Sequence, residues 1–270
     1  MNHSSSDMEV RRLGWAGLEL VSGGRSLVID LLEDASSLAP FVGEPHEPLP
    51  PPAMPGATAG LVTHLHADHT DPAALGRALA SDGLVLRPAR ARGRTLETVA
   101  TLYAEDGLQE AAVETRVLEP WESVELEPFQ ITAVPAVDGF GDPQISWVVE
   151  AGGRRIFHGG DTVFHGFWWL IAMRLGPFDA AFLPTNGAVC DFPHRQPPST
   201  LASTMDPVQA ATAAHVLGTG LAVPIHYDTI NRPPVYQQVD GPVEAFEMAA
   251  GERGVPIRVL QPGESLEWAA

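Results

Sequence analysis

A short run of metal-binding side chains stands out at residues 63–69, which read THLHADH. Four side chains that can bind a metal ion fall within six residues, directly after an apolar stretch. In an extended or turn conformation His64 and His66 point the same way, while Asp68 and His69 can turn towards a neighbouring point. This geometry suits two metal ions that share one cleft. The alternative is a surface loop that happens to be rich in histidine.

On these residues the chain resembles the metallo-β-lactamase-fold superfamily, whose signature is His-x-His-x-Asp-His at the end of a strand. Asp30 ends a predicted strand and matches the acidic residue that supports the site. Residues 159–162 (GGDT) match the strand-end motif of the bridging aspartate, and residues 224–227 (PIHY) match that of the last histidine. The helix expected after Met205 and the strand that follows it resemble the same region in one branch of the superfamily. That branch contains the ascorbate-6-phosphate lactonase and its uncharacterised metal-dependent hydrolase relatives.

The resemblance implies a fold of the α/β (α+β) class, a four-layer αββα sandwich with two metal ions at the open edge between its sheets. His64 and His66 would bind the first ion. Asp68, His69 and His226 would bind the second, and Asp161 would lie between the two.

One position departs from the superfamily's pattern. Where the first metal ion takes a further histidine, this chain has Asp138. Two divalent ions carry four positive charges, which Asp68, Asp138, Asp161 and a bridging hydroxide would cancel. The added oxygen ligand favours manganese or iron relative to the zinc common in the family. The alternative is that Asp138 does not bind, which leaves one well-held metal ion.

The chemistry expected of such a site is hydrolysis, with a metal-bound hydroxide as the nucleophile. The substrate would be a small-molecule ester, lactone, amide or phosphoester. Two other classes stay open: a dinuclear iron oxidoreductase on the same fold, and a degenerate metal-binding protein.

The side chains assigned to catalysis are Asp68, Asp161, His158 and His165. His158 lies three residues before Asp161 and either supports the site or binds metal. His165 lies four residues after Asp161, and it could donate a proton if a helix begins at Thr162. A packed or exposed helix histidine is the alternative. The aromatic residues at 164–169 would form either a substrate wall or ordinary core.

The elements that must position these residues follow from apolar patterning and turn signals. Strands are expected at 10–13, 18–21, 26–30, 60–63, 115–118, 123–127, 129–134, 145–150, 154–158, 179–183, 221–225 and 257–260. Helices are expected at 71–80, 94–103, 107–114, 164–175, from Asp206 onwards, and at 243–250. Residues 40–58 hold seven prolines and predict a long loop, and 184–204 predicts a second loop at the substrate rim.

Composition limits the partners. The formal charge is −18 and the chain has no lysine, which argues against binding to nucleic acid or to an anionic membrane surface. Cys190 is the single cysteine, so no internal disulfide framework can form. No segment resembles a signal peptide or spans a bilayer. We expect one cytoplasmic domain over residues 1–270, with a small-molecule substrate and possible homo-oligomers.

Overall fold

Two six-stranded sheets form the centre of the computed structural model, which describes residues 7–268. The first sheet runs in sequence order: β1 (Glu9–Gly14), β2 (Gly17–Ser22), β3 (Arg25–Ile29), β4 (Ala57–Leu61), β5 (Leu79–Arg87) and β6 (Glu114–Val117). The second sheet has the order β13 (Ala222–Ile225), β11 (Ala180–Pro184), β10 (Arg154–His158), β9 (Ile145–Ala151), β8 (Phe129–Pro135) and β7 (Ser123–Leu126). A separate small ribbon pairs β12 (Val189–Cys190) with β14 (Tyr236–Gln237).

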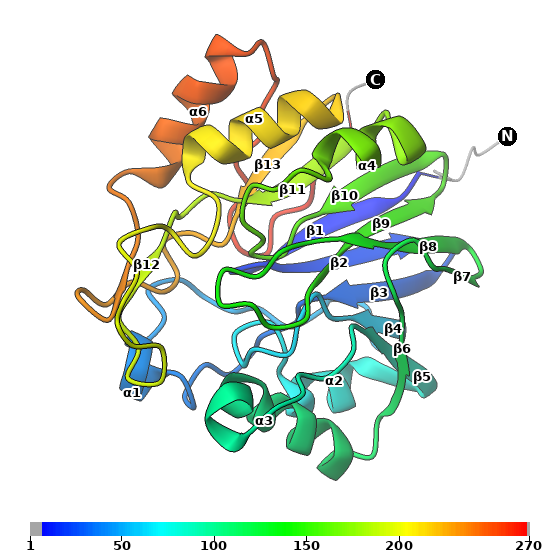
Figure 1. Cartoon of the computed structure of the whole chain (residues 1–270). Helices are drawn as coiled ribbons and strands as arrows, with labels where there is room; N and C mark the ends of the chain where they lie inside the picture. The colour runs from blue at the N-terminus through cyan, green and yellow to red at the C-terminus, as the bar shows by residue number, and fades with distance from the viewer. Residues whose placement is uncertain (1–6, 269–270) are drawn as a thin grey trace, which may run out of the picture.

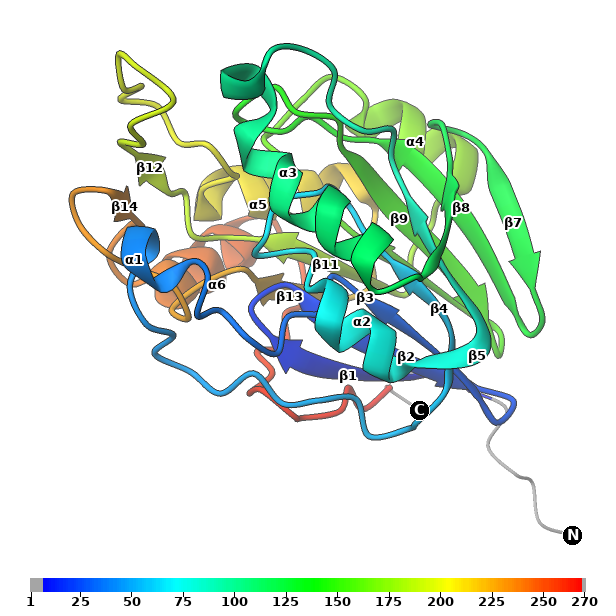
Figure 2. The same ribbon diagram turned by 90° about the horizontal axis from the view of Figure 1, so that it is seen from below.

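Helices cover the outer face of each sheet (Figures 1 and 2). On the first sheet, α2 (Pro72–Ala78) and α3 (Thr95–Glu110) bury Leu75 and Leu108 with residues of the strands. On the second, α4 (Trp168–Leu175), α5 (Pro207–Leu217) and α6 (Pro242–Glu252) bury Ile171 and Phe246. The short α1 (Ala39–Val42) lies apart from both helical layers. The predicted four-layer αββα sandwich is therefore confirmed.

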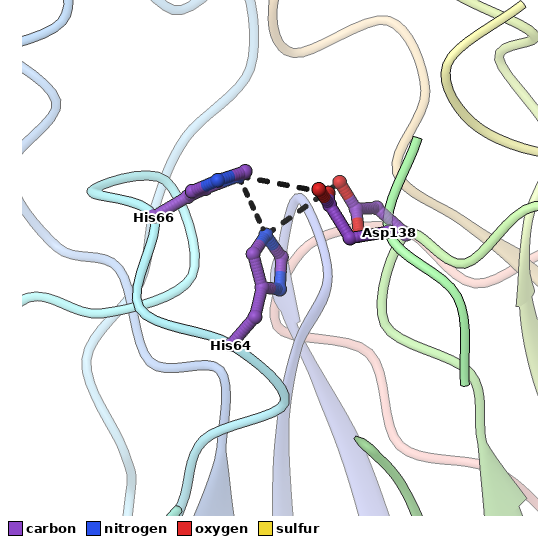
Figure 3. A group of neighbouring side chains, drawn as sticks. His64, His66 and Asp138 are labelled. Carbon is purple, nitrogen blue, oxygen red and sulfur yellow. Dashed lines mark hydrogen bonds and ion pairs between the residues drawn. The ribbon is translucent and has the colours of Figure 1, made fainter. Parts of the chain in front are cut away.

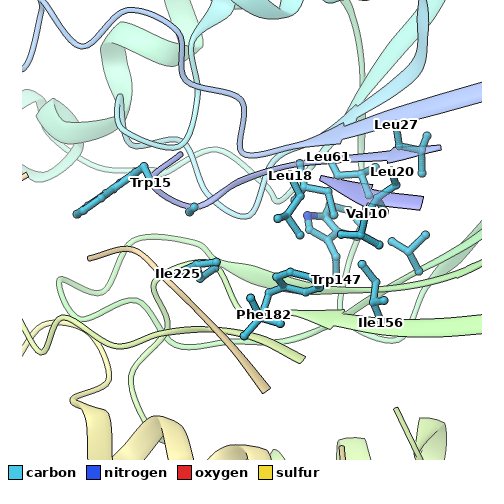
Figure 4. Close-up of a cluster of buried hydrophobic side chains, with 14 of the residues drawn as sticks. Val10, Trp15, Leu18, Leu20, Leu27, Leu61, Trp147, Ile156, Phe182 and Ile225 are labelled. Carbon is cyan, nitrogen blue, oxygen red and sulfur yellow. The ribbon is translucent and has the colours of Figure 1, made fainter. Parts of the chain in front are cut away.

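The main hydrophobic core lies between the two sheets. Leu18 and Leu20 of β2 face Trp147, Ile156 and Phe182 of the second sheet, and all five side chains are fully buried (Figure 4). Side chains of a strand alternate between its two faces, so the buried inner strands give alternate residues to this core and to a helical layer. Removing this apolar surface from water is the main force that holds the two sheets together.

One edge of this sandwich collects the ends of many strands. In the first sheet β3 to β6 run parallel, and in the second β10, β11 and β13 run parallel, so within each sheet their carboxyl ends lie at one edge. β8 runs in the same direction because β9 is antiparallel to both β8 and β10. The edges of the two sheets are also joined, since the Ile145 amide donates a hydrogen bond to the Thr63 carbonyl (3.0 Å). The carboxyl ends of β3, β4, β8, β10 and β13 can therefore contribute to one site.

Two predicted helix boundaries were wrong. The pair of short helices at 94–103 and 107–114 is one helix, α3, which continues through Gly107. A side chain there would approach Pro72 of α2 to 2.7 Å, so glycine allows the close contact of these two helices. The helix expected from Phe164 begins only at Trp168. Before it the chain forms a turn, in which the Phe167 amide donates a hydrogen bond to the His165 ring.

Three strand predictions also need correction. No strand was predicted at β5, where Asp82 and Gly83 look like a turn, yet residues 79–87 pair with both β4 and β6. The ribbon of β12 and β14 was missed as well, because two-residue strands leave no periodic pattern. The last strand, expected at 257–260, is only an isolated bridge between Ile257 and Ala222. Within residues 7–268 no helix is both long enough and apolar enough to cross a lipid bilayer.

Candidate metal centre

The strand ends bring seven metal-binding side chains together at this edge. They form three overlapping groups, in each of which the nitrogen and oxygen atoms lie within 4.8 Å of one another. The groups are His64, His66, Asp138 and Asp161; His64, Asp68 and His69; and His69, Asp161 and His226. All seven predicted ligands are thus in one place, from the loops after β4, β8, β10 and β13. Because His64, His69 and Asp161 each belong to two groups, the cluster is continuous.

The first half of the cluster surrounds His66 (Figure 3). Its Nδ1 atom lies 2.9 Å from Nε2 of His64 and 4.0 Å from Oδ1 of Asp138, and the same His64 atom is 3.6 Å from Oδ2 of Asp161. Ligand atoms about 2.1 Å from one tetrahedral ion would stand about 3.4 Å apart. These spacings fit a metal ion of that size.

Hydrogen bonds fix which ring nitrogens face this half. The Thr63 hydroxyl donates to Asp30 (2.7 Å), so it accepts from Nδ1 of His64 (3.1 Å), and Nε2 of His64 keeps its lone pair. The other ring nitrogen of His66, Nε2, donates to Asp142 (2.9 Å). The two imidazoles therefore turn lone pairs towards each other, which is unfavourable unless a cation or a proton lies between them.

Asp138 supplies the oxygen of this half. Its Oδ2 atom accepts hydrogen bonds from the amides of Phe140 (2.9 Å) and Asp142 (2.8 Å). Its Oδ1 atom is buried and has no hydrogen-bond partner among residues 7–268. Since buried carboxylate oxygens are normally satisfied, this free oxygen fits a ligand for a positive ion. The aspartate thus stands where the superfamily's pattern has histidine.

The second half of the cluster contains Asp68, His69 and His226. Nε2 of His69 lies 3.1 Å from Nε2 of His226 and 3.4 Å from Oδ2 of Asp68, which is 3.7 Å from the His226 nitrogen. Asp30 accepts a hydrogen bond from Nδ1 of His69 (2.8 Å) and so directs Nε2 of this ring at the cluster. Asp30 also accepts from the amide of Thr63 (2.8 Å). The supporting role predicted for Asp30 matches these contacts.

The charges of the cluster favour positive ions. Burial acts to lower the pKa of His66, but the hydrogen bond to Asp142 and the nearby Asp138 together raise it to about 9. Burial raises the pKa of Asp161 to about 7, although His69 acts to lower it. Burial also lowers the pKa of His226 to about 4. His66 and Asp161 therefore bind protons tightly, and a divalent cation would compete with those protons for the same atoms.

Three residues that contact the cluster were missed in the sequence. Asp142 bonds His66, and the side-chain amide of Gln144 donates to Oδ1 of Asp161 (2.7 Å). Trp15 donates from Nε1 to Asp68 (3.1 Å), and its ring lies 3.8 Å from that of His226. None of the three belongs to the motifs around the ligands. The available signal was position: Trp15 stands in the turn between β1 and β2, and the other two directly precede β9.

The structure does not bring His158 or His165 into the cluster groups. His158 is buried, its Nε2 atom bonds the Ala16 carbonyl (2.8 Å) and its Nδ1 atom accepts from the Gly160 amide (3.2 Å). This agrees with a supporting position next to Asp161. The premise for His165 was wrong, because no helix begins at Thr162. His165 instead stacks on Trp168 with ring centroids 4.5 Å apart.

A cavity of about 370 Å³ opens above the cluster. His66, Asp68 and Asp161 lie at its floor. The 184–204 loop lines it, as predicted for a substrate rim, with Phe192, Pro193, His194, Arg195, Ser203 and Thr204. The proline-rich segment contributes only Phe41 and Val42, whereas α3, which was not predicted to line the site, contributes Val99, Ala100 and Tyr103. The aromatic residues at 164–169 do not line it, and Trp168 is part of the core under α4.

Fold and site together define a class of protein. A family model described as a β-lactamase superfamily domain matches residues 25–227, so the chain belongs to that superfamily. A protein of Thermus thermophilus named a UPF0173 metal-dependent hydrolase is 32% identical over 265 residues, which cover 96% of this chain and 98% of that protein. The chain is therefore a member of the UPF0173 group of metal-dependent hydrolases.

Solved structures agree on the fold. The isothiocyanate hydrolase from Delia radicum gut bacteria matches with a TM-score of 0.70 at 21% identity, covering 97% of this chain and 100% of that one. CmlA, a diiron β-hydroxylase from Streptomyces venezuelae, matches with a TM-score of 0.71 at 14% identity, covering 97% of this chain and 54% of that one. One fold thus holds proteins described as a hydrolase and as a hydroxylase.

Proposed function

We propose that the chain is a hydrolase with two divalent metal ions, which cleaves an ester, lactone, amide or phosphoester bond of a small molecule. The observation that carries this proposal is the unpartnered, buried Oδ1 atom of Asp138 beside the lone pairs of His64 and His66. His64, His66 and Asp138 would hold the first ion, and Asp68, His69 and His226 the second, with Asp161 between them. Divalent ions in such a site lower the pKa of a bound water and polarise the bond to be cleaved.

The chain's own residues supply orientation and charge. Asp30 and Asp142 hold the His69 and His66 rings through the nitrogens that face away from the cluster. Trp15 and Gln144 hold the carboxylates of Asp68 and Asp161. Three carboxylates, including that of Asp138, would offset three of the four charges of two divalent ions. Outer contacts of this kind change metal affinity or activity by about 10–100-fold when they are removed.

The carboxylate of Asp138 also bears on which metal the site prefers. Oxygen ligands suit manganese and iron better than an all-histidine set does. We therefore propose manganese or iron as the native ions, with zinc as the alternative. Elemental analysis of protein purified without added metal tests this, and a stoichiometric pair of zinc ions with neither iron nor manganese would contradict it.

The test of the hydrolase combines metal content with activity. Wild-type protein should hold two equivalents of metal per chain and cleave a member of a panel of chromogenic esters, lactones, amides, phosphoesters and β-lactams. Asp161→Ala should lose at least one equivalent and all turnover. Asp82→Ala is the matched control, because Asp82 is exposed on β5. A fully active Asp161→Ala protein would overturn the mechanism.

A second candidate function is favoured by the same aspartate. A mixed histidine and carboxylate pair of sites also suits two iron ions and oxygen chemistry, and CmlA, described as a diiron β-hydroxylase, shares the fold. Iron content, the optical band of an oxo-bridged pair and oxygen consumption separate this candidate from hydrolysis. Two bound irons with oxygen consumption and no hydrolysis in the panel would favour it.

A further inference from the structure

We infer that the cavity above the cluster takes a small molecule with a neutral, apolar body, and that it selects against molecules with a carboxylate or phosphate outside the bond that is cleaved. The inference rests on the proposed function, since it names the substrate class of that same site. Three features of the cavity carry it: its walls, its size and its lack of a free cation.

Most of the side chains that line the cavity are apolar or aromatic. The larger ones include Leu38, Phe41, Val99, Phe140, Phe192 and Tyr236. Phe140 and Phe192 form an aromatic pair with ring centroids 5.7 Å apart, and the Phe140 ring lies 6.2 Å from that of His66. An apolar group held between these rings would thus lie beside the candidate metal ligands.

The exposure of the walls points to an entrance. Phe41 and Tyr103 are 55% and 51% exposed, although each also lines the cavity. They belong to α1 and α3, which the sequence separates by more than fifty residues. The volume of about 370 Å³ lies within the range of about 300–1,000 Å³ that is usual for pockets of small ligands. An apolar small molecule can therefore enter between these helices and fill the space above the cluster.

The charges of the cavity walls argue against an anionic substrate body. The chain has no lysine, and among the described residues that line the cavity Arg195 is the only arginine. Its Nη2 atom is 3.0 Å from Oδ2 of Asp142, so its charge is already paired. Burial lowers the pKa of His194, and the neighbouring Arg195 lowers it further, so the surroundings of this ring favour its neutral form. Above the cluster itself, the described residues of these walls thus offer no unpaired arginine or lysine to a carboxylate or phosphate on the substrate's body.

A pair of fluorescent probes that differ in one charge tests the inference by binding alone. N-phenyl-1-naphthylamine is neutral, and 8-anilinonaphthalene-1-sulfonate has the same aromatic framework with a negative sulfonate. Titrated into the enzyme as purified with its metal, the neutral probe should bind at least tenfold more tightly than the sulfonate. Phe192→Ala should lower the affinity for the neutral probe at least fivefold. Phe192→Leu, which keeps most of the apolar volume, should lower this affinity less than twofold.

Met248→Ala is the control, because this side chain is 66% exposed on α6 and does not line the cavity. Equal or tighter binding of the sulfonate would overturn the inference, as would binding of the neutral probe that Phe192→Ala leaves unchanged. The two proposals fail separately. Phe192-dependent binding of the neutral probe without hydrolysis in the panel would contradict the hydrolase and support the cavity's preference. Hydrolysis that is faster for anionic than for neutral esters would contradict the preference alone.

Discussion

Nε2 of His66 lies 2.9 Å from Oδ2 of Asp142, although 76 residues of sequence separate the two. The same carboxylate oxygen accepts a hydrogen bond from Nη2 of Arg195, which belongs to the loop that lines the cavity (3.0 Å). Asp142 therefore connects a candidate metal ligand to the loop that lines the cavity. Its hydrogen bond fixes the His66 ring with Nδ1 directed at Asp138 and His64.

Replacing Asp142 with asparagine should weaken metal binding. The amide can still accept a hydrogen bond from His66, but it lacks the charge that makes the ring a stronger ligand. We expect metal affinity to fall by about 10–100-fold, measured by competition with a chromophoric chelator. Asp82→Asn, at an exposed position, is the control. Arg195→Gln should leave affinity within threefold of wild type, and an equal loss in that variant would assign the effect to the loop rather than to His66.

Replacing Asp138 with asparagine tests whether it is a ligand. The shape of the side chain and an acceptor for the amides of Phe140 and Asp142 are retained, while the negative charge beside His66 is lost. We expect the metal content to fall from two equivalents to one, and manganese to be lost more readily than zinc because a hard anionic oxygen has been removed. Elemental analysis after dialysis measures both. Two retained equivalents would show that Asp138 does not bind.

The parts of this site that could be predicted are those set by local spacing. His64, His66, Asp68 and His69 lie within six residues, and the strand before them can be recognised by its apolar run. Asp138 could be found despite its changed residue type, because the superfamily's pattern has a ligand at the end of this strand, β8. The motif fixes neither the metal nor the substrate.

The parts that could not be predicted depend on contacts across the fold. Gln144 lies beside Asp161 because β9 and β10 form a hairpin that pairs Trp147 with His158, a register that the predicted strand bounds did not specify. The cavity wall from α3 depends on how that helix packs, and its length was hidden by Gly107, whose role is visible only beside Pro72. No local pattern reports the contact of Gly107 with Pro72, because the two residues belong to different helices.

His165 predicts a dependence of stability on pH. Burial lowers its pKa to about 4 from an ordinary value near 6.5, so the folded protein favours the neutral ring stacked on Trp168. The folded state thus binds this proton less readily than the unfolded state does. Its stabilising contribution is full above about pH 6.5 and is lost as the pH falls towards 4. Allowing for partial exposure, the loss should be about 1–2 kcal/mol.

Urea unfolding of wild type and His165→Gln at pH 7 and pH 4.5 measures this effect. The variant should lose less of its free energy of unfolding on acidification, because its side chain does not titrate. Release of metal at low pH affects both proteins and cancels in the comparison. Since His165 lies outside the cluster groups and the cavity lining, the turnover of His165→Gln at pH 7 should stay within threefold of wild type. A loss of turnover of 100-fold or more in this variant would support His165 as a proton donor after all.

Removing the metal should lower the stability of the whole sandwich. The cluster joins loops from both sheets, so ions bound there stabilise the folded state by about 2.7 kcal/mol for each site held at 100 times its dissociation constant. For a chain of this size, each kcal/mol corresponds to about 2–4 °C in Tm. Calorimetry before and after treatment with a chelator measures the shift, and adding metal back should reverse it. An unchanged Tm after verified metal removal would show that the cluster does not bind ions in the folded protein.

Adding one free cation to the cavity wall should reverse part of its selectivity. Val99 lines the cavity from α3 and is 37% exposed, so an arginine there can reach the space while the helix is kept. Because Arg195 already pairs with Asp142, Val99→Arg would add a positive charge to a wall in which the existing arginine is neutralised. We expect the naphthalene sulfonate to bind at least fivefold more tightly to this variant, and the neutral probe to bind no more tightly than to wild type. Val208→Arg, at an exposed position of α5 outside the cavity, should change neither affinity. If Val208→Arg tightens the sulfonate as much as Val99→Arg does, the protein's overall negative charge, rather than the cavity, opposes anions.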